Sequence, residues 1–85
     1  MLNVVIMVLM ARDVPIRTPM IRLGQLLKLA GVIGSGAEVK PFLAVEPVWV
    51  NGAQEQRRGR QLHPGDVVRV GEQEFRVTSQ DPGAR

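Results

Sequence analysis

The sequence of 85 residues contains no cysteine and a single histidine, His63. Without cysteine there is no disulfide, no thiolate zinc site and no thiol nucleophile, and one histidine cannot build a histidine metal cluster. His63 precedes a proline and is typical of a turn residue. Glu72 and Glu74 flank an expected turn and are typical of a solvated pair rather than a buried acid–base dyad. We therefore expect no enzyme, no cofactor and no metal.

Aromatic residues are also scarce, so the core must consist mainly of Val, Leu, Ile and Met. The apolar run Val4–Ala11 is too short to cross a bilayer as a helix, which takes about 20 residues. It lacks the charged start and the cleavage site of a signal peptide. We interpret residues 1–11 as an apolar extension or an edge strand, and we expect a cytoplasmic protein without membrane contact.

What the sequence does contain is arginine. The net charge is +3, the pI is near 10.6, and nine of the eleven cationic residues are arginine. A chain of this length makes one small domain, which we expect over residues 12–78, followed by a flexible tail over 79–85. A basic, arginine-rich domain indicates an anionic partner, either nucleic acid or an acidic surface.

Hydrophobic spacing predicts two helices after an extended segment over residues 13–18, whose Pro15 favours a sheet edge. Helical spacing runs from Met20 to a C-terminal cap at Gly31. The second helix is expected over residues 36–45, because Ser35 stands three residues before Glu38, the spacing of a capping box. Pro41 conflicts with that helix and should kink or shorten it.

The rest of the chain predicts antiparallel strands over residues 48–50, 60–62, 67–70 and 74–78. Asn51-Gly52 suits a tight hairpin because both residues tolerate positive φ. Arg57, Arg58 and Arg60 then lie on a connection between strands, where fixed guanidinium groups suit phosphate recognition. A solvated basic loop without a ligand is the alternative.

These features follow one another in an order that resembles a known RNA-binding module. The residues that carry the resemblance are Arg22-Leu23, Leu26-Leu27, Ser35-Gly36, Ala37-Glu38, Val48-Trp49-Val50-Asn51-Gly52 and Pro64-Gly65-Asp66-Val67-Val68. The module is the domain named after the fourth protein of the small ribosomal subunit (the alpha-L RNA-binding motif), which also occurs in tyrosyl-tRNA synthetases and pseudouridine synthases. The resemblance to this module covers about residues 16–78. The segments Leu23–Ala30 and Arg57–Arg60 look like the single-domain bacterial members.

The resemblance implies an α+β fold in which a helix pair packs on a small antiparallel β-sheet, with a basic face that contacts folded RNA. By position, that face would carry the residues Arg22, Lys28, Ser35, Lys40, Arg57, Arg58 and Arg60. Pro41 departs from the pattern, and so does Glu46, which stands where a glycine is common.

Two further inferences concern the function. The helix start at Ser35-Gly36 offers free backbone N–H groups and could receive a phosphate, although simple capping by Ser35 is the alternative. We predict a monomeric, non-catalytic protein that docks on structured RNA, most plausibly ribosomal RNA or a ribosome-assembly intermediate. The alternative is a protein-interaction adaptor whose basic loop binds an acidic partner and whose N-terminal segment pairs with a sheet edge.

Overall fold

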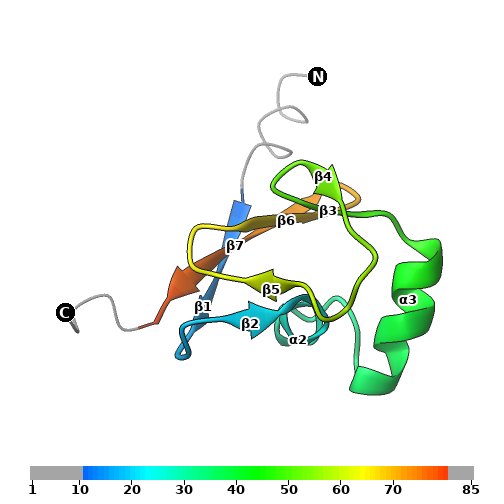
Figure 1. The fold of residues 1–85 in the computed structure, drawn as a ribbon, viewed down its shortest axis with the longest axis horizontal. Coiled ribbons are helices and arrows are strands. Elements are labelled where there is room, and N and C mark those ends of the chain that lie inside the picture. Colours follow the sequence, from blue (N-terminus) through cyan, green and yellow to red (C-terminus); the bar gives the residue numbers. More distant parts are fainter. Residues whose placement is uncertain (1–10, 81–85) are drawn as a thin grey trace.

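The computed structural model describes residues 11–80. The predictions for residues 1–10, and for most of the tail, lie outside the described residues. Figure 1 shows the helices lying beside the strands, which form a five-stranded and a two-stranded sheet within the described residues. The elements are β1 (Ala11–Ile16), β2 (Ile21–Arg22), α2 (Leu23–Leu29), the 3-10 turn η1 (Gly36–Glu38), α3 (Val39–Val45), β3 (Val48–Val50), β4 (Ala53–Gln54), β5 (Gln61–Leu62), β6 (Val67–Val70) and β7 (Gln73–Ser79).

The larger sheet has the strand order β1-β7-β6-β3-β4. The predicted antiparallel pairing is confirmed for β7, β6 and β3, and β3 also pairs antiparallel with β4, which was not predicted. By contrast, β1 pairs with β7 in parallel, with Val14 opposite Val77. The expectation of a purely antiparallel sheet was therefore wrong. Parallel neighbours need a long crossover, and here that connection comprises every element between β1 and β7. As predicted, the strand that contains Pro15 lies at the sheet edge.

A second sheet of two short strands corrects the predicted start of the first helix. Ile21 pairs with Leu62, and Arg22 with Gln61, so the chain is extended up to Arg22 and α2 begins at Leu23 rather than near Met20. Ile21 and Leu62 are both buried. Ile21, which the sequence placed at the start of the helix, therefore belongs to a strand that pairs with β5. At the other end, Gly31 has φ +81°, as predicted for a C-terminal cap.

The second helix is confirmed with a different start. The Ser35 side chain makes no capping hydrogen bond, and the Glu38 carboxylate accepts from the backbone N–H of Gly34 at 2.9 Å, so the predicted capping box was wrong. The segment begins as η1 and continues as α3. Pro41 is the third residue of α3 and therefore lies in the first turn of that helix, where proline is tolerated. Glu46 ends α3 with φ −99°, a conformation that needs no glycine.

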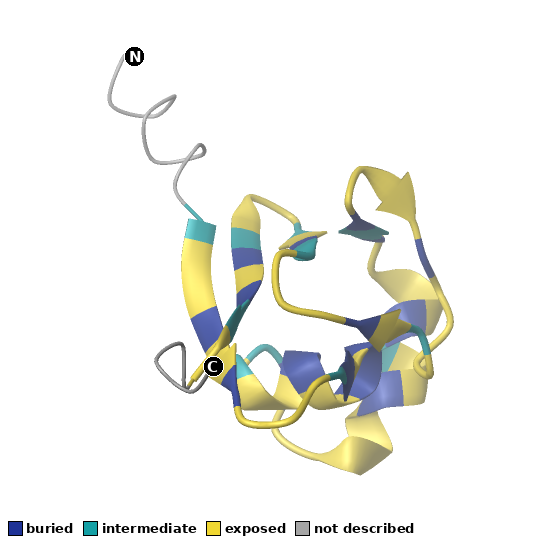
Figure 2. Ribbon diagram, turned by 60° about the vertical axis from the view of Figure 1, so that its left-hand side comes forward, coloured by how far each residue is buried: buried dark blue, intermediate teal, exposed yellow. Residues whose placement is uncertain are grey.

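One core joins both helices to both sheets (Figure 2). Leu23, Leu26 and Leu27 of α2 are fully buried, and so are Leu62, Val68 and Val77. Each such side chain contributes about 1.5–3 kcal/mol relative to exposure. The core therefore fixes α2 against the strands, and α2 is the element from which the candidate site is built. No helix among residues 11–80 is long and apolar enough to span a membrane.

Candidate nucleic-acid interface

Asn51 and Asp66 link two turns of the chain, one at Asn51-Gly52 and the other over residues 63–66. Asn51 adopts φ +52°, and its side chain donates to an Asp66 carboxylate oxygen at 3.1 Å and accepts from the N–H of Val67 at 2.9 Å. The other Asp66 oxygen accepts from the N–H of His63 at 2.8 Å. Burial opposes the ionised form, yet these hydrogen bonds lower the pKa of Asp66. The segment between the two turns is thus anchored at both ends.

That segment contains the arginine loop, which we define as residues 55–60. Its first residue, Glu55, is a buried charged side chain at 7% exposure. Arg57 binds the Glu55 carboxylate with two guanidinium nitrogens, each at 3.0 Å, and Arg60 binds it at 2.9 Å. We call these three residues the Glu55 triad. Its two cationic groups share one anion, so the triad carries a net charge of +1.

Backbone contacts reinforce the triad. The backbone N–H groups of Gln56 and Arg57 donate to Glu55 at 3.1 Å and 3.0 Å. Hydrogen bonds from the Arg57 side chain and backbone lower the pKa of Glu55 to about 2, even though burial opposes this shift. The hydrogen bond to the Glu55 carboxylate and its negative charge raise the pKa of Arg57. Glu55 therefore stays ionised at any pH at which RNA binding is measured.

The arginine loop is also fastened to the start of α2. The N–H of Leu23 donates to the Arg60 carbonyl at 2.9 Å, and the N–H of Gly24 donates to the Arg58 carbonyl at 3.0 Å. The first N–H groups of a helix have no intrahelical partner, and here loop carbonyls satisfy two of them. The helix and the loop therefore position each other.

Gly24 allows the loop and α3 to approach α2 closely. A Cβ atom at this position would lie 3.0 Å from Val39 Cγ1 and 3.5 Å from Arg58 Cβ. A contact of 3.0 Å is tighter than carbon atoms prefer. Because Gly24 has no side chain, α3 and Arg58 of the arginine loop can both pack closely against α2.

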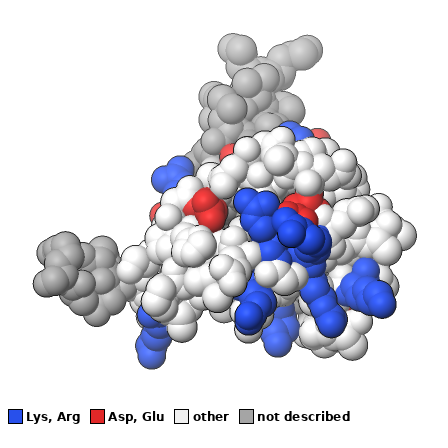
Figure 3. Space-filling view, viewed as in Figure 1, with Lys and Arg blue, Asp and Glu red and all other residues white. Residues whose placement is uncertain are grey.

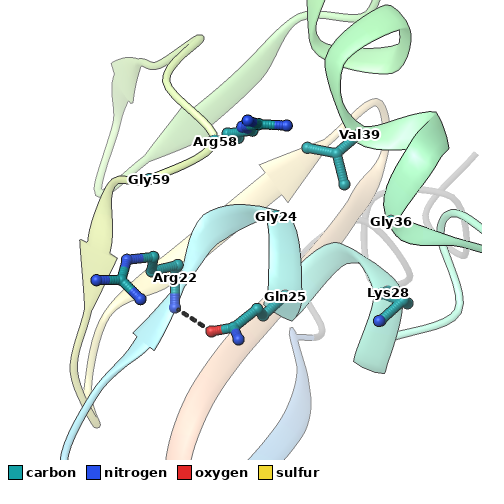
Figure 4. Close-up of a pocket in the computed structure, with 8 residues that line it drawn as sticks. All are labelled: Arg22, Gly24, Gln25, Lys28, Gly36, Val39, Arg58 and Gly59. Carbon is teal, nitrogen blue, oxygen red and sulfur yellow. Dashed lines mark hydrogen bonds between the residues drawn. The ribbon is translucent and has the colours of Figure 1, made fainter.

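A groove opens at this junction (Figure 4). It encloses about 390 Å³ and presents three cationic side chains, from Arg22, Lys28 and Arg58. No salt bridge involves any of these three among residues 11–80. We call it the basic groove; its lining is Arg22, Gly24, Gln25, Lys28, Gly36, Val39, Arg58 and Gly59.

Arg58 also lines a second hollow of about 580 Å³, which it shares with Lys40 of α3. Figure 3 shows Lys and Arg side chains gathered over this part of the molecule. Arg58 therefore lines both of two neighbouring hollows, with Arg22 of β2 and Lys28 of α2 in one and Lys40 of α3 in the other. This arrangement can bind several phosphates without a metal ion, and among residues 11–80 no cluster of metal-ligating side chains occurs.

The predicted site residues fall into three groups. Arg22, Lys28, Gly36 and Arg58 lie together in the basic groove, and Lys40 lies in the adjoining hollow. Arg57 and Arg60, expected to face a ligand freely, are paired with Glu55. Ser35 is exposed but lines neither hollow, and the Glu38 carboxylate lies at the neighbouring Gly34 N–H. That negative charge makes the predicted phosphate position at the helix start unfavourable.

Sequence reasoning missed Glu55, Gly24 and Gln25. The signal for Glu55 was present, because it is the acidic residue in the otherwise basic run Glu55–Arg60. Gln25 lines the basic groove and accepts from the N–H of Arg22 at 3.2 Å through its side-chain oxygen, so its amide N–H groups take no part in this bond. The spacing of apolar residues assigned Gln25 only to the outer face of a helix.

The family model of the S4 domain matches residues 14–78. This chain belongs to the S4 domain family. A relative in Bacillus subtilis (strain 168), named probable ribosome maturation protein RlbA, is 52% identical over 61 residues, which cover 72% of this chain and 86% of that protein. The resemblance inferred from the order of motifs is thereby confirmed, and the matched residues include both helices and the whole arginine loop.

Proposed function

We propose that this S4 domain protein binds structured RNA without catalysing a reaction, and that it docks on ribosomal RNA or on ribosomal particles. Family membership supports an RNA partner, and the name of the Bacillus relative supports a connection with ribosome maturation. The observation that carries the proposal is that Arg22, Lys28 and Arg58 line one groove and that Lys40 lines the hollow beside it.

The chemistry of the groove suits an RNA backbone better than a single small anion. Its cationic groups come from three separate segments, and the two hollows that Arg58 joins can hold successive phosphates. Double-stranded RNA is recognised mainly by shape, phosphates and 2′-hydroxyl groups. The amide group of Gln25, which lines the groove, can donate to a hydroxyl or phosphate oxygen. The ligand is therefore a folded RNA rather than a particular base sequence.

Binding to a hairpin RNA and to a single strand of equal length, measured over a salt series, tests the proposal. We expect tighter binding to the hairpin and a fall of log K with log salt that corresponds to about three to five phosphate contacts, at about 0.9 per contact. Absence of binding to either RNA at low salt would contradict the proposal and favour the adaptor alternative.

A pair of charge reversals locates the site. Arg58→Glu should weaken hairpin binding by at least tenfold and reduce the salt slope, because it places a negative charge between the two hollows. Arg76→Glu is the matched control, since Arg76 is exposed on β7 and lines neither hollow. Equal losses for the two variants would indicate a general charge effect and would refute the assignment of the site to the basic groove.

A further inference from the structure

The Glu55 triad places an acidic group within the most basic segment of the chain. On electrostatic grounds alone, such a group weakens binding to a polyanion. Burying a carboxylate also costs free energy unless it is paired and hydrogen-bonded. Glu55 is paired with two guanidinium groups and accepts from two backbone N–H groups, so its oxygens are well satisfied. A buried acidic group of this kind calls for a role other than direct contact with RNA.

The triad orients the arginines of the loop in different directions. Arg57 and Arg60 turn back to the Glu55 carboxylate, whereas Arg58 extends into the basic groove and the adjoining hollow. The N–H of Arg60 donates to the Arg57 carbonyl at 3.2 Å, which closes a tight turn around Arg58 and Gly59. The three arginines are alike in charge, but only Arg58 reaches the groove lined by α2 and α3.

The same turn connects the triad to α2. The carbonyl groups of Arg58 and Arg60 accept from the first N–H groups of the helix. A change in the loop conformation would therefore move Arg58 relative to Arg22 and Lys28. This continuous set of contacts runs from the Glu55 carboxylate, through the loop backbone, to the basic groove.

We propose that Glu55 is a positioning residue for the RNA site: it holds the guanidinium groups of Arg57 and Arg60 on its carboxylate, so that the loop presents Arg58 as its principal phosphate contact. The expected effect on RNA binding rests on the proposed function, whereas the expected effect of Glu55 on the loop conformation does not. Simple electrostatics predicts that loss of a negative charge strengthens binding to RNA. The positioning role predicts the opposite, namely that loss of the Glu55 charge weakens binding.

The first experiment compares Glu55→Gln with Glu72→Gln in hairpin binding. Both variants raise the net charge by one, but Glu72 is exposed in the turn between β6 and β7 and belongs to no salt bridge among the described residues. We expect Glu55→Gln to weaken binding about tenfold, the effect of misplacing one charge-assisted contact, and Glu72→Gln to leave binding unchanged or slightly tighter. Binding by Glu55→Gln that equals or exceeds that of the wild type overturns the inference.

A double-mutant cycle separates positioning from general destabilisation. If Glu55 acts through Arg58, Glu55→Gln should have less than a twofold effect in a protein that already carries Arg58→Ala. Additive losses would show that Glu55 acts through another route and would overturn the inference. Glu55→Asp, which keeps the charge on a shorter side chain, should restore part of the affinity that Glu55→Gln loses.

Hydrogen exchange of the free protein supplies a readout that needs no RNA. In Glu55→Gln the exchange rates of the Leu23 and Gly24 amides should rise at least fivefold more than that of the Val77 amide, which is bonded to the Asp66 carbonyl and reports the change in global stability. If RNA binding fails altogether, this result still tests the positioning role. Wild-type binding to RNA with unaltered exchange and affinity in Glu55→Gln would refute the positioning role and leave the proposed function intact.

One further variant keeps the test decisive if Glu55→Gln does not fold. Arg57→Gln breaks the bidentate pair at a side chain that is 76% exposed, so the core is untouched. Exchange at the Gly24 amide should again be faster than in the wild type. Unchanged exchange in Arg57→Gln would contradict the role of the triad in fixing the loop.

Discussion

The stability of the domain should depend on pH through Glu55. The pKa of this carboxyl is 4.5 in its ordinary state and about 2 in the fold, because Arg57 and Arg60 favour the ionised form. A group with a lowered pKa stabilises the fold at every pH above its unfolded value. The contribution is therefore complete at pH 7, and it declines as the pH falls from about 4.5 to about 2.

The size of the effect follows from the same shift. A fall of the pKa from 4.5 to about 2 corresponds to at most about 3–4 kcal/mol. Solvent screens the pair, since the Arg57 side chain is 76% exposed, and this reduces the expected contribution to about 1–2 kcal/mol.

Urea denaturation of the wild type and of Glu55→Gln at several pH values measures this contribution. We expect the variant to be less stable by about 1–2 kcal/mol at pH 7, and the difference to shrink as the pH is lowered toward 2.5. Glu72→Gln serves as the control, with no comparable difference at pH 7. A difference between wild type and Glu55→Gln that is constant from pH 7 to pH 2.5 would refute the reasoning, because it would not arise from ionisation of Glu55.

Three other predictions concern the packing around the site, and denaturation measurements at pH 7 check each of them. Gly24→Ala should lower the free energy of unfolding less in a protein that already carries Val39→Ala than in the wild type, because the added methyl group meets Val39 Cγ1 at 3.0 Å. Strictly additive losses of stability would contradict this contact. Asn51→Gly keeps positive φ but loses the links to the turn at Asp66, and should cost about 1–2 kcal/mol, whereas an unchanged stability would show that those links contribute nothing. Leu62→Ala should cost about 2–5 kcal/mol although β5 has only two residues, and a cost below 1 kcal/mol would show that the small sheet is not part of the core.

Much of the fold could be predicted because its signals are local. Asn51 and Gly52 both have positive φ, and this requirement is visible in the residue types themselves. The apolar spacing of α2 and the alternation in β7 likewise report which side chains face a core. The errors arose where two conformations bury the same side chain, as at Ile21, or where a carboxylate had a choice of backbone partners, as at Glu38.

The candidate site was predictable in composition but not in arrangement. The sequence by itself determined the order of the two helices and of the longer strands, the family resemblance and the position of the arginine loop between two turns, since each depends on neighbouring residues. Only the tertiary structure decided that β1 joins β7 in parallel, that Glu55 is buried between Arg57 and Arg60, and that Arg58 enters the basic groove. Arg57, Arg58 and Arg60 are the same residue type within four positions. Their roles differ because contacts with distant segments, above all with the start of α2, set the direction in which each side chain extends.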